Sequence, residues 1–146
     1  MADHKVEQII DAIIPLVTGL VTTDMNVTRG RVSPLKESIS SALSVYQGAD
    51  NTDEYNWPSV YSSLTVYIDI HAKDSSEQID QVCNRIRKEI NIAIMAVDRL
   101  GLSFVKDINE EGASEPELSG DGNKPTAVMR VTYKIEYNRS VTDPSQ

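Results

Sequence analysis

Hydrophobic and polar residues alternate most regularly in two segments, residues 60–72 and 127–137. In the first segment the apolar positions are Leu64, Val66, Ile68, Ile70 and Ala72, separated by polar or aromatic residues. In the second they are Ala127, Met129, Val131, Tyr133, Ile135 and Tyr137. Because successive side chains of a strand point to opposite faces, both segments predict β-strands with one buried face.

Two other segments have the three-and-four spacing of an amphipathic helix. The first apolar stripe consists of Ile9, Ile10, Ile13, Leu16, Val17 and Leu20. The second consists of Ile79, Val82, Ile86, Ile90, Ala93 and Val97. Asp3 is the expected cap of the first helix, and Pro15 should kink or break it. The second helix should start with a cap in residues 74–76 and stop near Gly101.

Weaker patterns predict further strands at residues 26–33, 39–47 and 102–108. The polar segments 48–57 and 109–125 have little to bury, so we expect two mobile loops, and a frayed polar tail over residues 139–146. The whole chain, 1–146, then forms a single domain. Its fold class is α+β, a two-layer sandwich of about four to five mainly antiparallel strands with both helices packed on one face.

Charge and composition exclude several classes of function. The net charge of −8 opposes binding to phosphate backbones, so no nucleic-acid recognition is expected. The single cysteine, Cys83, permits no intrachain disulfide, which fits a reducing cytoplasm. No segment approaches the about 20 apolar residues of a membrane span, so no membrane association is expected.

The sequence contains no motif for catalysis. It lacks a nucleophile elbow, a phosphate-binding loop and a set of metal ligands, since the two histidines, His4 and His71, are not spaced with Cys83 as a zinc site. Glutamate pairs such as Glu110 and Glu111 fall in an expected loop, where no rigid pocket would tune their pKa values. We therefore expect no enzyme activity, no catalytic residues, no metal and no cofactor.

A few residues are instead candidates for a protein interface, because arginine and large aromatic side chains are enriched at such surfaces. These interface candidates are Arg29, Arg31, Tyr46, Trp57, Tyr61 and Tyr67. The alternative is that the exposed strand tyrosines bind no other protein and occur there because tyrosine favours β-strands.

The organisation of the chain resembles the tail terminator family of long-tailed bacteriophages, typified by the lambda minor tail protein that ends tail growth. The segment Arg29-Gly30-Arg31-Val32-Ser33-Pro34-Leu35 is similar to a stretch that follows the first helix in that family. The strand that ends in Val45-Tyr46 and the last strand, which ends in Tyr133-Lys134-Ile135-Glu136-Tyr137, are similar as well. The resemblance covers almost the whole chain, although its motifs are short. Ile39-Ser40 departs from the Leu-Pro that often precedes the second strand.

The resemblance implies a structural virion protein. Family members form a hexameric ring on the completed tail tube, stop its polymerisation and present a surface for the head-tail connector. The implied partners are other copies of the chain, the tail tube protein and the connector protein. The implied location is the neck of the virion, and the host cytoplasm during assembly.

Two alternatives remain. The chain could be another phage neck or tail-completion protein, or a small-ligand regulatory binding domain, because helices on an antiparallel sheet also describe such modules. A regulatory domain needs a pocket with converging polar groups, and no glycine-rich turn beside a strand points to one.

Overall fold

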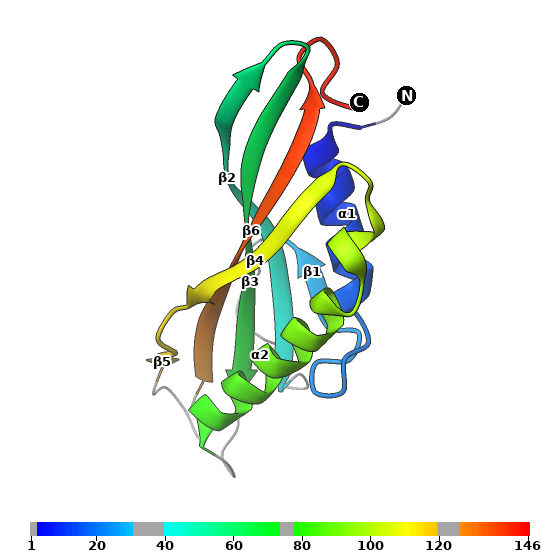
Figure 1. Cartoon of the computed structure of the whole chain (residues 1–146). Helices are drawn as coiled ribbons and strands as arrows, with labels where there is room; N and C mark the ends of the chain where they lie inside the picture. Colours follow the sequence, from blue (N-terminus) through cyan, green and yellow to red (C-terminus); the bar gives the residue numbers. More distant parts are fainter. Residues whose placement is uncertain (1–2, 31–39, 74–77, 120–125) are drawn as a thin grey trace.

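The structure is a computed structural model that describes residues 3–30, 40–73, 78–119 and 126–146. It has two helices and one six-stranded sheet, so the fold is α+β (Figure 1). The elements follow in the order α1 (Lys5–Val17), β1 (Val27–Arg29), β2 (Ser41–Asn56), β3 (Ser59–Lys73), α2 (Ile79–Met95), the short 3-10 helix η1 (Asp98–Gly101), β4 (Val105–Ala113), β5 (Glu117–Ser119) and β6 (Thr126–Ser140).

The sheet is larger than the four to five strands expected. Its strand order is β1-β2-β3-β6-β4, and β5 pairs with β6 beside β4. All pairs are antiparallel except β1 with β2. Strand β1 keeps only three residues of the predicted segment 26–33, of which residues 31–33 lie outside the described part.

The predicted buried faces of the two long strands are confirmed. On β3, Leu64, Val66, Ile68 and Ile70 are all fully buried, and Ala72 is 1% exposed. On β6, the six apolar positions from Ala127 to Tyr137 are at most 4% exposed. At about 1.5–3 kcal/mol for each large aliphatic side chain, this face supplies a major part of the hydrophobic stabilisation.

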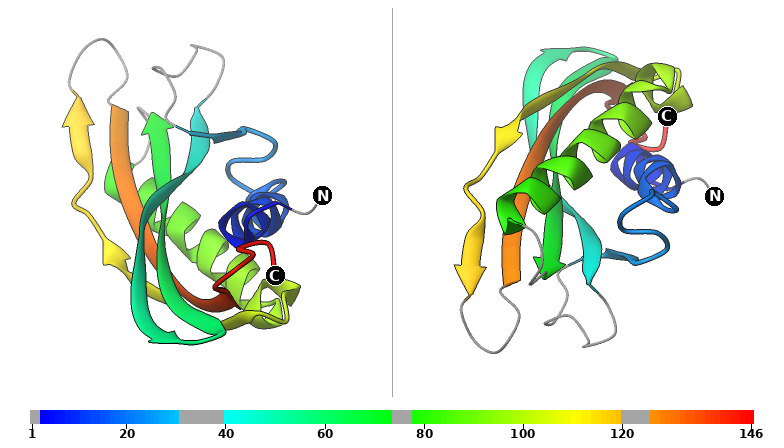
Figure 2. Two further views of the ribbon diagram at one scale, coloured as in Figure 1. Left: turned by 90° about the horizontal axis from the view of Figure 1, so that it is seen from above. Right: turned by 90° about the horizontal axis from the view of Figure 1, so that it is seen from below.

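Both helices lie on the same side of the sheet (Figure 2). Helix α1 buries Ile9, Ile10, Ile13 and Val17, as predicted, and it continues through Pro15 to end at Val17. Its cap differs from the prediction, because the N-cap residue is His4 and not Asp3. The imidazole Nδ1 of His4 accepts a hydrogen bond of 3.0 Å from the backbone N–H of Val6.

The second helix is rotated slightly from the predicted stripe. Helix α2 buries Val82, Cys83, Ile86, Ile90 and Ile94. Ala93 is only half-buried, and Val97 lies beyond the helix, which ends at Met95 rather than near Gly101. The expected caps, residues 74–76, lie outside the described part, and the N-cap residue is Gln78. Polar contacts also attach α2 to the sheet, since Arg87 Nε donates to Glu110 on β4 over 2.7 Å.

Residues 48–57, predicted to be a mobile loop, instead continue β2 into a long hairpin with β3. Asp50 pairs with Leu64 and Asn56 with Ser59, and Trp57 and Pro58 form the turn. We call residues 48–63 the hairpin arm, which projects beyond the helices at the top of Figure 1. The prediction was wrong because backbone pairing with β3 holds this segment extended, although its own side chains are mostly exposed.

The second predicted loop and the frayed tail also need correction. Strand β4 includes residues 105–108 of the predicted strand 102–108, but it continues to Ala113, into the expected loop. Residues 117–119 pair with β6 as well, and residues 120–125 of the expected loop lie outside the described part. The polar tail folds back onto the body of the protein. The N–H of Lys5 donates to the carbonyl of Pro144, and the N–H of Val141 donates to that of Pro58, each over 2.9 Å.

The exposed and buried faces of α2 allow a matched test of its packing. Ile90 is fully buried and Ile92 is 60% exposed, so the same truncation can be made on both sides of one helix. We expect Ile90→Ala to lower the free energy of unfolding by about 2–5 kcal/mol, because it leaves a cavity in the core. Ile92→Ala should cost less than about 1 kcal/mol. Urea denaturation followed by circular dichroism measures both, and equal costs would contradict this position of α2.

Candidate functional site

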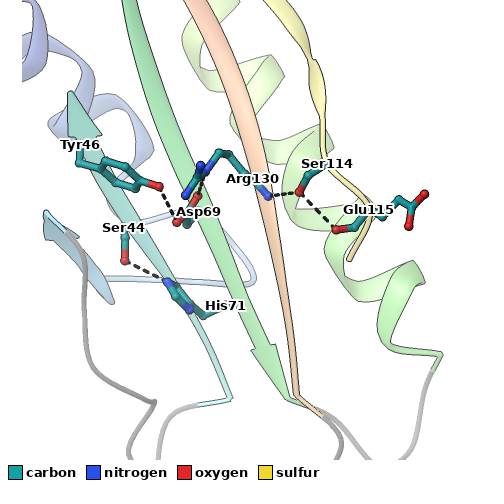
Figure 3. A network of polar contacts seen from close by, with 7 residues as sticks. All are labelled: Ser44, Tyr46, Asp69, His71, Ser114, Glu115 and Arg130. Carbon is teal, nitrogen blue, oxygen red and sulfur yellow. Dashed lines mark hydrogen bonds and ion pairs between the residues drawn. The ribbon is translucent and has the colours of Figure 1, made fainter. Parts of the chain in front are cut away.

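The face of the sheet opposite the helices carries the most elaborate polar arrangement of the described residues. Because Leu64 to Ala72 face the core, the residues between them on β3 point to the outer face. Cross-strand register then brings Ser44 beside Asp69, Tyr46 beside Tyr67 and Arg130 beside Asp69. We call Ser44, Tyr46, Tyr67, Asp69, His71 and Arg130 the outer-face cluster; Figure 3 shows all of these residues except Tyr67.

Asp69 is the centre of this cluster. Its side chain is 10% exposed and forms an ion pair with Arg130, in which Arg130 Nε donates to Oδ1 over 3.1 Å. The hydroxyl of Tyr46 donates to the other carboxylate oxygen, Oδ2, over 2.9 Å. A buried carboxylate is costly unless its lone pairs are satisfied, and these two donors provide that compensation.

Arg130 lies against two aromatic rings. Its Cζ atom is 4.7 Å from the ring centroid of Tyr67 and 5.4 Å from that of Tyr46. The two rings are in contact, with centroids 5.4 Å apart. The hydrogen bond to Asp69 raises the pKa of Arg130 above its ordinary value. The guanidinium is therefore held in one orientation by an ion pair on one edge and by cation–π contacts on its face.

Gly48 makes room for this arrangement. A Cβ atom at residue 48 would lie 2.7 Å from Cε2 of Tyr67, which is closer than real Cβ contacts allow. The Tyr67 ring consequently packs directly over the backbone of β2. This contact gives a structural reason for a glycine in the middle of a strand, where glycine otherwise weakens pairing.

His71 extends the cluster along β3. Its Nε2 atom is 3.0 Å from Ser44 Oγ. Burial lowers the pKa of the imidazole, and the Asp69 carboxylate partly opposes this shift by raising it. His71 is thus favoured in its neutral form, with Ser44 as its hydrogen-bond partner.

Arg29, a predicted interface residue, is engaged within the chain. Its Nη1 and Nη2 atoms each donate to Glu7 on α1 over 2.6 Å. Asp11 lies 3.8 Å from Nη1. This bidentate pair attaches β1 to α1. Arg31, the second predicted arginine, lies outside the described residues.

The other candidates fall into two places. Tyr46 and Tyr67 belong to the outer-face cluster. Trp57, 64% exposed, is at the tip of the hairpin arm, and Tyr61 lies on the arm with Lys106 Nζ 4.3 Å from its ring centroid. The structure therefore brings two of the six candidates together.

Asp69 and Arg130 were not singled out from the sequence. They are 61 residues apart and become neighbours only through the register of β3 with β6. One available signal was a lone charge among the alternating residues of each strand, in Tyr67-Ile68-Asp69-Ile70-His71 and Met129-Arg130-Val131. Pairing two such strands would place both charges on one face.

The arrangement favours recognition over chemistry. Asp69 is already hydrogen-bonded, and the contact of Ser44 with His71 joins two neighbouring strands, β2 and β3. No group of three or more histidine, cysteine, aspartate or glutamate residues in the described ranges could hold a metal ion. Glu110, expected in a solvated loop, is instead in β4 and paired with Arg87. None of the described helices is long and apolar enough to cross a bilayer.

An open cleft elsewhere is a weaker candidate. It is lined by Lys5, Pro58, Ser59, Asn138, Arg139, Ser140 and Gln146. Lys5 Nζ donates to the carbonyl of Asn138 over 3.0 Å and lies 4.6 Å from the ring centroid of Phe104. These contacts attach the start of α1 to the end of β6, so Lys5 stabilises the fold and is not available to bind a ligand in the cleft.

Comparisons with family models and with curated proteins give no independent assignment of this site. The chain matches no protein-family model, and no curated protein is significantly similar to it.

The hydroxyl of Tyr46 provides a test of the cluster. Tyr46→Phe removes the hydrogen bond to the buried Asp69 carboxylate and should lower the free energy of unfolding by about 1–3 kcal/mol. Tyr61→Phe is the matched control, because its hydroxyl has no hydrogen bond within the described residues, and it should cost less than about 0.5 kcal/mol. Chemical denaturation measures both. Equal values would show that the Asp69 contact adds no stability.

The His71 imidazole should make stability depend on pH. Since its pKa is lower in the folded protein than the ordinary 6.5, the unfolded chain binds the proton more readily. The His71 contribution is therefore present above pH 6.5 and decreases as the pH falls through the folded-state pKa. His71→Gln should flatten this part of the curve of unfolding free energy against pH. An unchanged slope below pH 6.5 would contradict a buried, neutral His71.

Proposed function

We propose that this protein is a structural subunit of a bacteriophage virion, a tail terminator that forms a ring on the completed tail tube. The ring, a homohexamer, stops tube polymerisation and provides the attachment surface for the head-tail connector. The protein performs no catalysis and needs no cofactor. It works in the host cytoplasm during assembly and afterwards at the neck of the virion.

The observation that carries this proposal is the division of the molecule into a packed body and two surfaces suited to protein contact. Within the described residues, no helix covers the outer face of the sheet, where the arginine and two tyrosines of the cluster lie. The hairpin arm projects from the same sheet with Tyr55 and Trp57 62% and 64% exposed. Arginine and aromatic side chains of this kind are the residue types that dominate interface energies.

The sequence resemblance supports the choice of this particular assembly. The segment from Arg29 onward, the Val45-Tyr46 pair and the aromatic-rich segment up to Tyr137 follow each other in the order of the tail terminator family. The strands themselves are longer than this resemblance implies, since β2 continues to Asn56 and β6 to Ser140. In this proposal the body of the subunit is the two-layer sandwich, made of both helices and the part of the sheet that they cover. The hairpin arm extends beyond it, and we assign the arm to contacts with other subunits.

Tube growth in the presence of the protein tests the proposal. Tubes assembled from the tail tube protein of the same virus should stop elongating when the protein is added, and electron microscopy should show a six-fold cap at one end. The physical reason is that ring closure leaves no free lateral interface between subunits, while the outer face of the ring would not match the next layer of tube protein. Tubes of the same length with and without the protein, and no binding to tubes in sedimentation, would contradict the proposed function.

A further inference from the structure

Resting on this proposed function, we propose that the outer-face cluster of one copy binds the hairpin arm of the next copy, with the Glu54 carboxylate on Arg130. In a ring this contact is head-to-tail, because each copy gives its arm to one neighbour and receives the arm of the other neighbour in its cluster. It gives Arg130 a specific role at an interface, whereas the guanidinium of the interface candidate Arg29 is bound by Glu7 of its own chain.

The receptor half of this contact is Arg130. Its Nε atom is used by Asp69, whereas Nη1 and Nη2 have no hydrogen bond within the described part of the chain. The side chain is 37% exposed, so these two donors are accessible. The nearby Glu115 does not occupy them, since its side chain points away from Arg130 (Figure 3). The pair of Nη donors has the spacing that a carboxylate accepts bidentately.

The arrangement around Arg130 favours a protein carboxylate over a free ion. Tyr46 and Tyr67 hold the guanidinium in place before binding, which reduces the entropy lost on contact. Their rings also form an apolar rim, which would exclude water from a docked side chain. Aromatic residues next to the bound carboxylate could pack against these two rings.

The hairpin arm supplies such a carboxylate. Residues 47–59 contain Asp50, Asp53 and Glu54 and no lysine or arginine. Asp50 accepts hydrogen bonds of 3.0 and 2.9 Å from the hydroxyl of Tyr137, and Asp53 accepts one from Ser63. Glu54 is exposed and has no hydrogen bond or ion pair among the described residues. The exposed Tyr55 and Trp57 follow it directly.

Charge complementarity selects a second copy as the occupant. The chain has 22 acidic and 14 basic residues, so an arginine with free donors is a scarce feature on an acidic surface. The acidic arm and the exposed Nη donors of Arg130 are both present on every copy. Each subunit can therefore give one contact and receive one, as a closed ring requires.

Two charge-removing variants of the full chain separate this contact from general repulsion. Glu54→Gln and Glu111→Gln each remove one negative charge from an exposed strand position. If the only effect were relief of like-charge repulsion, both would strengthen self-association equally. The proposal expects Glu54→Gln to weaken self-association by at least about tenfold, and Glu111→Gln to leave it unchanged or slightly stronger. Sedimentation velocity across a concentration series measures both.

Arg130→Gln completes a double-mutant cycle. Glutamine can still donate to Asp69, and thermal melting checks that the fold persists. Arg130→Gln alone should weaken association as Glu54→Gln does, and the double variant should be no weaker than either single one. If Arg130→Gln does not fold, the comparison of Glu54→Gln with Glu111→Gln still decides the question.

Three results would overturn the contact: a monomer at every concentration, equal behaviour of Glu54→Gln and Glu111→Gln, or additive effects in the cycle. If the wild-type protein caps tubes but Glu54→Gln and Glu111→Gln self-associate equally, the tail terminator function is supported and the contact is wrong. A Glu54-dependent dimer with two-fold symmetry that does not cap tubes would support the contact and contradict the proposed function.

Discussion

Backbone pairing of β3 with both of its neighbours is the constraint on which the rest of the structure depends. The strand pairs with β6 from Ser59 opposite Ser140 to Lys73 opposite Thr126, and with β2 over nearly the same length. One register therefore fixes which residues of three strands face the helices. A slip by one residue would move Ile68 to the outer face and Asp69 into the core, at a cost that the fold could not sustain.

The same constraint explains which features the sequence could predict. The alternation in β3 and β6 specifies their faces, because burial of every second residue leaves a clear pattern. Burial of one face of each helix likewise produced the apolar stripes that predicted both helices. In α2, however, Ile94 rather than Ala93 faces the core of the protein. The outer half of β2 and residues 109–113 of β4 lack such a pattern. Their backbones pair while their side chains stay in water, so a polar strand was mistaken for a loop.

The candidate site shows a related limit. The alternation in residues 60–72 places Tyr67 and His71 on the same face of one strand, and residue type alone makes Tyr46 and Tyr67 interface candidates. The partners that turn these residues into a cluster are Asp69 and Arg130, which meet only across strands. The role of Arg29 was likewise undetermined by its own segment, since Glu7 is on another element 22 residues away. Cross-strand register and helix placement carry this information, and neither is visible in local periodicity.

Electrostatics then sets how such a subunit can assemble. With a net charge of −8, copies of the chain repel one another, and this long-range term weakens with salt over a Debye length of about 10 Å at 0.1 M. The contact of Glu54 with Arg130 would act in the opposite sense at short range. In that contact the tyrosine rings beside Arg130 would shield the pair from water, so the pair would be screened less than the net charge. Added salt therefore removes more repulsion than attraction, and ring closure should be stronger at moderate salt than at low salt. In the proposed function, a tail tube that offers further contacts would shift the same balance and would make rings more stable at the end of a finished tube than in free solution.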